Sequence, residues 1–309
     1  MTLIAILLAL ATERYWRRHA PLRIFRHLAA RLLLWRKGLI RVPWLNGVSG
    51  ALLLLVIPLL PIAAVQGLLG HASGLHWEII GLIFSTVILA LCIGDRWYSE
   101  FIKHYLQAWR HGDVEGANHY LQQVTGFDGS ILNARQLNRR FLEMVLERML
   151  ERVLAVLFWF VVLGPLGAVG YRLLCQMKGP LQQVSRRPQR EIGLEAALLH
   201  LKAIMEWLPV RLAMLVCALT GSYADARQGW RRAQGLEWVA NLGERSMRLL
   251  RGAGLGALQL EGFYAAADQG ELSLQQMEEH VEALRDMIKR VLIAWMAGLS
   301  LLTLTGWLE

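Results

Sequence analysis

Apolar residues gather in runs long enough to cross a bilayer. The clearest extends from Val48 to Leu69, and its about 20 apolar residues match a hydrocarbon core of roughly 30 Å. A second run, from Ile79 to Gly94, returns after a short loop. Met1 to Ala11 is also apolar, and no small-residue cleavage site follows it, so we expect an uncleaved anchor. The pattern predicts membrane helices in the first 94 residues.

A third apolar stretch, from Val153 to about Leu174, is interrupted by Gly164 and Pro165. Proline removes a backbone donor and clashes with the preceding turn, so the helix must kink or break there. Broken backbone at membrane depth is stable only where protein buries it or where it lines a cavity. A re-entrant hairpin bent at Gly164-Pro165 fits the pattern. A full crossing with Leu208 to Leu219 as a short return span also fits, and is favoured because bends are common in spanning helices.

The remaining stretches are polar and helical in period, and period-2 alternation is nearly absent. Ser273-Leu274-Gln275-Gln276 has the spacing of a capping box that opens a long helix, which leads into a final apolar span, Ile288 to Leu308. We predict an all-α polytopic membrane protein with two cytoplasmic helical portions. Its parts are a membrane region with a basic arm (1–94), a cytoplasmic portion (95–152), the broken segment with a short second segment (153–220), a second cytoplasmic portion (221–287) and a C-terminal membrane helix (288–309).

Composition agrees with a membrane protein. The 309 residues are 55% hydrophobic, with a mean hydropathy of +0.36 and a net charge of +9. Nine Arg or Lys residues and no acid lie between Arg14 and Arg41, interleaved with Trp16 and Trp35. This composition predicts a cytoplasmic arm that contacts anionic lipid. The loop Gly70 to Trp77 has no Lys or Arg, so we expect it on the periplasmic side of the membrane. No nucleic-acid-binding pattern accompanies the charge, so we expect no nucleic-acid partner.

Two other patterns are interpreted as structural. Cys92, Cys175 and Cys217 form no C-x-x-C pair and no zinc spacing, so buried free thiols are expected. Three glycines suggest a nucleotide loop but follow no strand, which favours glycines of helix packing; they are Gly252, Gly254 and Gly256.

Glu143, Glu147 and Glu151 recur every four residues just before the broken segment and therefore share one helix face. Three carboxylates in line could hold Mg²⁺, which takes oxygen ligands. The alternative is a solvated helix whose glutamates pair with neighbouring arginines; these are Arg139, Arg140, Arg148 and Arg152.

Arginine also occurs inside or beside apolar sequence. Arg211 follows Glu206 and Pro209 in one such stretch, and Tyr171-Arg172 closes the broken segment. A charged arginine is energetically costly in an apolar segment and marks a polar pathway or a paired site. Its planar guanidinium can donate two parallel hydrogen bonds to a phosphate or a carboxylate. Snorkelling to a headgroup is the alternative.

As an ordered set these features resemble the CobD/CbiB superfamily. The matching residues are Leu157-Phe158-Trp159, Gly164-Pro165-Leu166-Gly167-Ala168, Tyr171-Arg172, Trp207 to Leu212 and Ala218 to Gly221, with Gly126 and Asp128 at its G-x-D element. The resemblance implies a membrane enzyme of cobalamin assembly that uses ATP and Mg²⁺ to form an amide on a corrinoid carboxylate. It also implies that the three glutamates lie on the family's acidic helix.

This chain departs from the synthase pattern at several positions. On the acidic helix, Met144 and Arg148 occupy positions where the synthases have polar residues. After Tyr171-Arg172, Cys175 and Lys178 occupy the positions where the synthases have Asn and Asp. Replacing a carboxylate by lysine reverses the local charge and should oppose binding of a Mg-nucleotide there. The replacements argue against the synthase reaction.

The sequence also resembles the AmpE branch of the superfamily, in the opening Met1-Thr2-Leu3 with Glu13-Arg14 and in Trp207 with Pro209 to Ala213. That resemblance implies a multi-pass protein of the bacterial inner membrane, accessory to β-lactamase induction and peptidoglycan recycling. A regulatory protein of this kind would bind a muropeptide, a nucleotide or a protein partner at a polar site beside the broken helix; the candidate ligand-binding residues are Asp128, Tyr171, Arg172, Glu206 and Arg211. An amide-forming ligase acting on an unknown carboxylate and a structural membrane scaffold are the alternatives.

Overall fold

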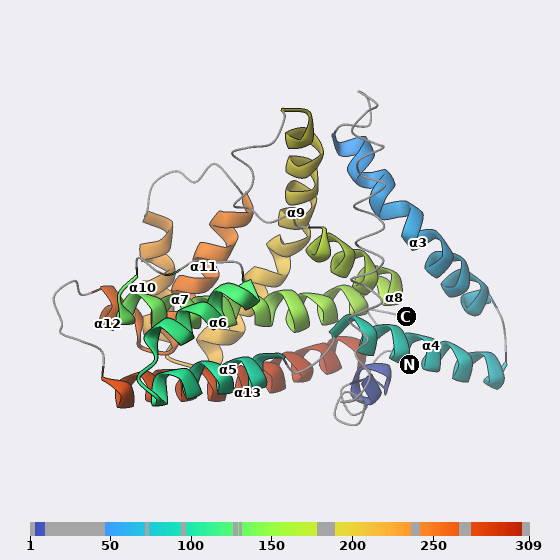
Figure 1. The fold of residues 1–309 in the computed structure, drawn as a ribbon. Coiled ribbons are helices and arrows are strands. Elements are labelled where there is room, and N and C mark those ends of the chain that lie inside the picture. The colour runs from blue at the N-terminus through green and yellow to red at the C-terminus, as the bar shows by residue number, and fades with distance from the viewer. Residues whose placement is uncertain are drawn as a thin grey trace. The chain divides into compact units, whose positions relative to one another are not determined.

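The computed structural model describes residues 4–9, 47–71, 74–93, 97–125, 129, 132–177, 189–235, 242–265 and 273–304. Every regular element in these ranges is helical, as predicted (Figure 1). The elements are α3 (Val48–His71), α4 (Leu75–Ile93), α5 (Trp97–Arg110), α6 (Val114–Thr125), α7 (Ala134–Met149), a π-helical turn (Leu150–Leu154), α8 (Ala155–Gln176), α9 (Gln189–Thr220), α10 (Tyr223–Gly235), α11 (Leu242–Ala257), α12 (Glu261–Ala265) and α13 (Leu274–Leu304).

Four helical stretches in the described ranges are long and apolar enough to cross a membrane. They are Val48–His71, His76–Ile93, Ala134–Gln176 and Gly193–Thr220. Each exceeds the roughly 17 residues that a bilayer core requires. The chain is therefore a helical membrane protein. The basic arm predicted to contact anionic lipid lies outside the described residues.

The helices form two compact units. Unit 1 comprises Met1–Asp95, Glu151–Pro209 and Gly298–Glu309, and unit 2 comprises Arg96–Leu150 and Val210–Ala297. Within unit 1, α3 and α4 pack against each other and against α8. Within unit 2, α11 packs against both α10 and α7, and α5 packs against α6. Each of these two units contains segments from several of the five parts predicted from the sequence, so the units do not test that division. The five-part division stays a prediction.

The predicted break in α8 is present and lies at Gly164, which has φ 67° and ψ −156°. Only glycine adopts such a backbone without strain. Gln66 of α3 bridges the break: its Nε2 donates to Leu163 O at 3.4 Å, and its Oε1 accepts from Leu166 N at 3.3 Å. One side chain thus replaces backbone hydrogen bonds that Pro165 prevents, which satisfies the polar groups that a bilayer cannot.

Close packing of α11 explains its glycines. A Cβ at Gly252 would lie 2.7 Å from Gly229 O of α10, and a Cβ at Gly256 would lie 2.4 Å from Asp225 O. A Cβ at Gly254 would lie 2.5 Å from Leu146 Cδ1 of α7. The interpretation of these glycines as packing residues is confirmed.

Two helix boundaries differ from the apolar segments seen in the sequence. The apolar stretch of α9 extends over Gly193–Thr220 and continues through Pro209, whereas only the last part, 208–219, was predicted as a span.

The predicted capping box at the start of α13 is confirmed, since Ser273 N donates to Gln276 Oε1 and Gln276 N donates to Ser273 Oγ, both at 3.2 Å. The helix it opens, α13, is not among the four candidate spans found in the described ranges, so the C-terminal span stays a prediction.

Candidate functional site

The acidic helix α7 begins at a second capping box. Asn133 Oδ1 accepts from Gln136 N at 2.8 Å, and Gln136 Oε1 accepts from Asn133 N at 3.2 Å. This cap fixes the first turn and therefore the direction in which later side chains point. Glu143 and Glu147, four residues apart, lie on one face of the helix.

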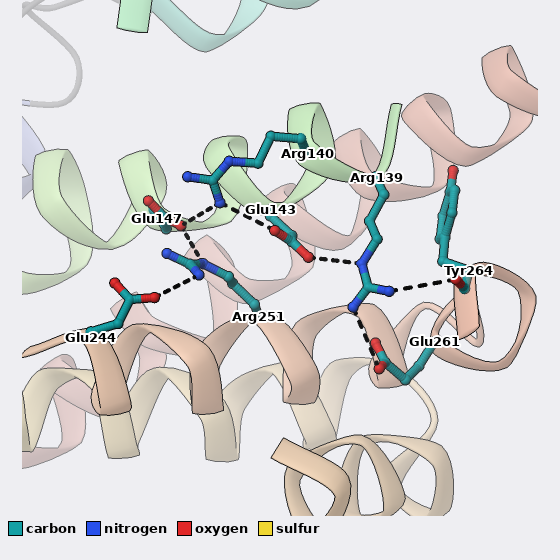
Figure 2. Close-up of polar contacts among 8 residues, drawn as sticks. All are labelled: Arg139, Arg140, Glu143, Glu147, Glu244, Arg251, Glu261 and Tyr264. Atoms are coloured by element: carbon teal, nitrogen blue, oxygen red, sulfur yellow. Dashed lines mark hydrogen bonds and ion pairs between the residues drawn. The ribbon is translucent and has the colours of Figure 1, made fainter. Parts of the chain in front are cut away.

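Both glutamates are held by arginines (Figure 2). Glu143 accepts from Arg139 Nε at 2.9 Å and from Arg140 Nη1 at 3.2 Å. Glu147 lies 3.6 Å from Arg140 Nη1 and also pairs with Arg251 Nε of α11. From the sequence, pairing of these glutamates with arginines was the alternative to a magnesium site. Two of the arginines considered there, Arg139 and Arg140, form such pairs.

The network extends to two further glutamates of unit 2. Arg251 Nη1 lies 3.0 Å from Glu244 Oε1, and Arg139 Nη2 lies 3.7 Å from Glu261 Oε1 (Figure 2). Burial opposes the charged form of Arg251, but the attraction of Glu147 and Glu244 outweighs it and raises the Arg251 pKa. In the ion pairs of this network, four carboxylates contact three guanidinium groups.

This arrangement does not present a ready magnesium cage. Within the described ranges, no three His, Cys, Asp or Glu side chains are grouped to hold a metal ion. Glu151 lies in the π-helical turn Leu150–Leu154, where the backbone departs from the α-helical period assumed in the sequence analysis. The proposed metal role of the three glutamates stays a prediction.

A second polar group joins α7, α12 and α13. Asn138 Nδ2 donates to Tyr264 Oη at 2.8 Å, and Tyr264 Oη lies 2.9 Å from His280 Nδ1. Burial raises the pKa of Tyr264 and lowers that of His280. Nearby, the guanidinium of Arg135 lies 4.2 Å from the centre of the Phe263 ring, a cation–π contact.

Unit 1 contains a buried charged group between α8, α9 and the π-helical turn. Tyr171 Oη donates to Glu206 Oε1 at 2.9 Å, Lys202 Nζ pairs with that same carboxylate, and Lys202 lies 2.9 Å from Glu151 Oε1. Tyr171, Glu206 and Lys202 are 0%, 1% and 5% exposed. Charged residues inside a membrane unit are costly and indicate a functional site.

Arg172 of α8 is 3% exposed, and its Nε and Nη2 have no hydrogen-bond partner among the described residues. A buried guanidinium without acceptors is strongly unfavourable. Its fork is suited to a carboxylate or a phosphate. Arg172 is therefore the strongest candidate in unit 1 for holding an anion.

The break in α8 borders a cavity, as expected for irregular backbone at membrane depth. The cavity has a volume of about 350 Å³, and Gly164 and Pro165 form part of its wall with Gln66 and Phe160. Gly167 leaves no room for a side chain, since a Cβ there would lie 2.4 Å from Trp159 O. The glycine–proline motif thus shapes both the break and the cavity.

The structure brings together only some of the residues predicted from the sequence. Tyr171 and Glu206 meet directly in unit 1, while Arg211 belongs to unit 2 and is exposed. Asp128 and Lys178 lie outside the described residues, and Cys175 is half-buried and not part of a disulfide. Sequence reasoning missed seven members of the three polar groups: Asn138, Lys202, Glu244, Arg251, Glu261, Tyr264 and His280. Lys202 had a usable signal, because it lies four residues before Glu206 in an apolar helix.

Comparison with known proteins gives consistent matches. The family model described as CobD/Cbib protein matches residues 2–290. A cobalamin biosynthesis protein CobD of Stutzerimonas stutzeri is 30% identical over 94% of this chain and 93% of its own length. CobD of Chromobacterium violaceum is 30% identical over 63% of this chain and 62% of its own length. CobD of Klebsiella pneumoniae is 26% identical over 60% and 58%. No solved structure matches.

These matches overturn the main function expected from the sequence. The relatives carry the name of cobalamin biosynthesis proteins, and none of these findings supports a regulatory protein of β-lactamase induction or peptidoglycan recycling. The prediction of an AmpE-like regulatory protein is therefore wrong, and the muropeptide ligand expected with it was not tested. The residues quoted for that branch did not separate it from CobD proteins, one of which aligns over 94% of this chain.

The superfamily resemblance itself is confirmed. The family match leaves out only the first residue and residues 291–309, and a relative aligns along almost the full length of both chains. The chain belongs to the CobD/Cbib protein family.

Proposed function

We propose that this protein is a ligase of the bacterial inner membrane that forms an amide on the carboxylate of a cobalamin precursor, at the expense of ATP. The observation that carries the proposal is the CobD relative aligned over 94% of the chain. The buried polar residues of both units support it, because an apolar membrane protein retains such costly groups where chemistry requires them.

Amide formation requires that a carboxylate oxygen be converted into a leaving group. ATP would supply that activation by transferring a phosphoryl or adenylyl group to the carboxylate oxygen; an amine nitrogen then forms the C–N bond, and phosphate or AMP leaves with that oxygen. Mg²⁺ would enter with the nucleotide phosphates, since Mg²⁺ is usually held by one or two carboxylates plus phosphate oxygens. In this proposal Arg172 binds an anionic group of a substrate through its two unpartnered nitrogens. Glu147 would offer a carboxylate to the nucleotide's cation, and Arg251, which pairs with Glu147 in this structure, would face phosphate.

Nucleotide binding to the purified protein in detergent tests these assignments. Mg-ATP at about 100 times its dissociation constant should add roughly 2.7 kcal/mol to the free energy of unfolding. We expect that stabilisation in the unaltered chain, and its loss in Glu147→Gln. Glu244→Gln is the matched control, because Glu244 contacts the same arginine but is 45% exposed.

The absence of any response to Mg-ATP in the folded chain would contradict the proposed function. An equal response in Glu147→Gln and in the unaltered chain would remove Glu147 from the nucleotide site. The unfolding temperature without nucleotide serves as the folding control for each variant.

A further inference from the structure

Helix α10 turns its small residues inward and its large ones outward. Ala226 is 1% exposed, and Gly229 packs so closely on α11 that a Cβ there would collide with the backbone oxygen of Gly252. Tyr223 and Trp230, the two aromatic residues of the helix, are 63% and 42% exposed. Close backbone contact thus holds α10 on α11, and the two aromatic side chains point away from the core. An amphipathic helix that served only the core of its own domain would bury them.

The outward face of α10 is one continuous stripe. Its members recur at spacings of three and four residues, and all are exposed; they are Tyr223, Arg227, Trp230, Arg231 and Gln234. Residues at these spacings are neighbours on a helix surface. We call these five residues the basic aromatic stripe.

The basic aromatic stripe carries positive charge and no acid. Within the described ranges, Arg227 and Arg231 form no ion pair or hydrogen bond. The single acid of α10, Asp225, lies on another side of the helix, where it accepts from Ser222 Oγ at 2.5 Å and from Gln259 Nε2 at 3.2 Å. Its charge is therefore engaged away from the stripe. Two arginines beside two exposed aromatic rings complement a surface that is both anionic and partly apolar.

Helix α10 directly follows a candidate membrane span. The apolar part of α9 ends at Thr220, three residues before α10 begins at Tyr223. Leu215 and Leu219, in the last turns of α9, are 58% and 69% exposed, as expected of side chains that face lipid. These turns of α9 belong to the same unit as α10. Because the polar zone of the bilayer begins where a span ends, the stripe begins at the depth where Trp and Tyr are enriched.

We propose that α10 lies in the membrane interface, with the basic aromatic stripe against the headgroups of anionic phospholipids. Arg227 and Arg231 bind phosphate oxygens through their planar guanidinium groups. Tyr223 and Trp230 place their rings among the headgroups, which suit side chains with an apolar body and a polar tip. Since α10 packs on α11, which carries Arg251, this contact holds the network of Figure 2 near the membrane surface. The contact is independent of the proposed ligase activity.

Quenching of a fluorescent label by lipid tests the proposal. The full chain with Gln234→Cys, labelled with a bimane, is placed in phosphatidylcholine nanodiscs that contain a nitroxide-labelled lipid. We expect quenching, about threefold stronger per molecule when the nitroxide is on phosphatidylglycerol than on phosphatidylcholine, because basic residues attract the anionic headgroup. Labelled Gln275→Cys, at an exposed polar position of α13, is the control and should not be quenched by lipid. The parent chain, treated in the same way, gives the background from its own cysteines.

Charge variants test the arginines. Arg227→Gln combined with Arg231→Gln should abolish the preference for phosphatidylglycerol. Lys103→Gln combined with Arg110→Gln removes the same charge from exposed positions of α5 and should leave the preference unchanged. All four side chains are exposed, so we expect these variants to fold, and unfolding temperatures check this.

Three results in the folded chain would overturn the proposal: no quenching by lipid at position 234, equal quenching by the two lipids, or a preference that survives the loss of both arginines. A label at position 234 that neither lipid nor aqueous iodide reaches would also overturn it, since protein, such as a second copy of this chain, would then cover the stripe.

Discussion

The ammonium of Lys202 in α9 lies 2.9 Å from the carboxylate of Glu151 in the π-helical turn, and both side chains are largely buried in unit 1. Lys202 also pairs with Glu206, to which Tyr171 donates a hydrogen bond. One cation thus pairs with two carboxylates that neither lipid nor apolar protein would solvate. The lysine holds the buried group together.

Lys202→Met should therefore destabilise the protein by about 3–5 kcal/mol, because it leaves two buried carboxylates without their cation. Thermal unfolding in detergent should show a fall of several degrees. Lys289→Met is the control, since Lys289 pairs with Asp286 at 2.7 Å in an exposed position. The control should change stability by at most about 1 kcal/mol. Equal effects of the two substitutions would show that Lys202 has no special role.

Gly164→Ala should cost about 1–3 kcal/mol, because φ at this position is 67° and a Cβ would lie 2.9 Å from Gln66 Nε2. Gly170→Ala is the matched control in the same helix. A Cβ at Gly170 meets Leu59 Cδ1 at 3.4 Å, an ordinary contact, so we expect little change or a small gain. Unfolding temperatures of the two variants give the comparison, and equal temperatures would refute a strained break.

The break illustrates how much of the fold the sequence contains. Gly164-Pro165 inside an apolar run predicted it directly, because proline forbids the regular hydrogen bonds. The partner that repairs the break, Gln66, could not be predicted, since it lies about a hundred residues away and only tertiary packing brings it there. The π-helical turn at Leu150–Leu154 has no local signal in the sequence either.

In the candidate site, too, contacts within one helix could be predicted from the sequence, and contacts between helices could not. Arginine pairing with Glu143 followed from i, i+3 and i, i+4 spacing. Arg251 and Glu261 reach the network from other helices, so no local spacing reveals them. The function expected first was wrong for a different reason. A family motif indicates the fold, whereas the function within the family has to be inferred from matches along the whole chain.

Gly252→Ala should destabilise unit 2 by more than about 1 kcal/mol, because the added Cβ would lie 2.7 Å from Gly229 O and push α10 from α11. Gly298→Ala in α13 meets nothing within 4 Å and should be neutral or stabilising by up to about 1 kcal/mol. Denaturant or thermal unfolding distinguishes the two. A Gly252→Ala variant as stable as the parent would contradict close packing at this position.

Stability should fall as the pH drops below about 7, in part because of His280. Burial lowers its pKa from the ordinary value of 6.5, with Arg135 acting in the same direction and Glu279 opposing. The unfolded chain then binds a proton at higher pH than the folded chain, so stability is lost as pH falls through 6.5 toward the lowered value.

His280→Gln should reduce this loss, measured as the difference between unfolding temperatures at pH 7.5 and pH 5.5. His111→Gln is the control, because His111 lies in the turn after α5 and its Nδ1 contacts only Gln107 O of that helix among the described hydrogen bonds. A difference that is the same in His280→Gln and in the unaltered chain would exclude His280 as a source of the pH dependence.

The most direct test of the central claim is growth of a bacterial strain that lacks its own CobD and needs cobalamin made from incomplete precursors. Expression of this chain should restore growth, and mass spectrometry of the corrinoids should detect the newly formed amide. Glu244→Gln should retain the rescue and Arg172→Gln should abolish it. Folded, membrane-inserted protein that yields neither growth nor amide would contradict the account.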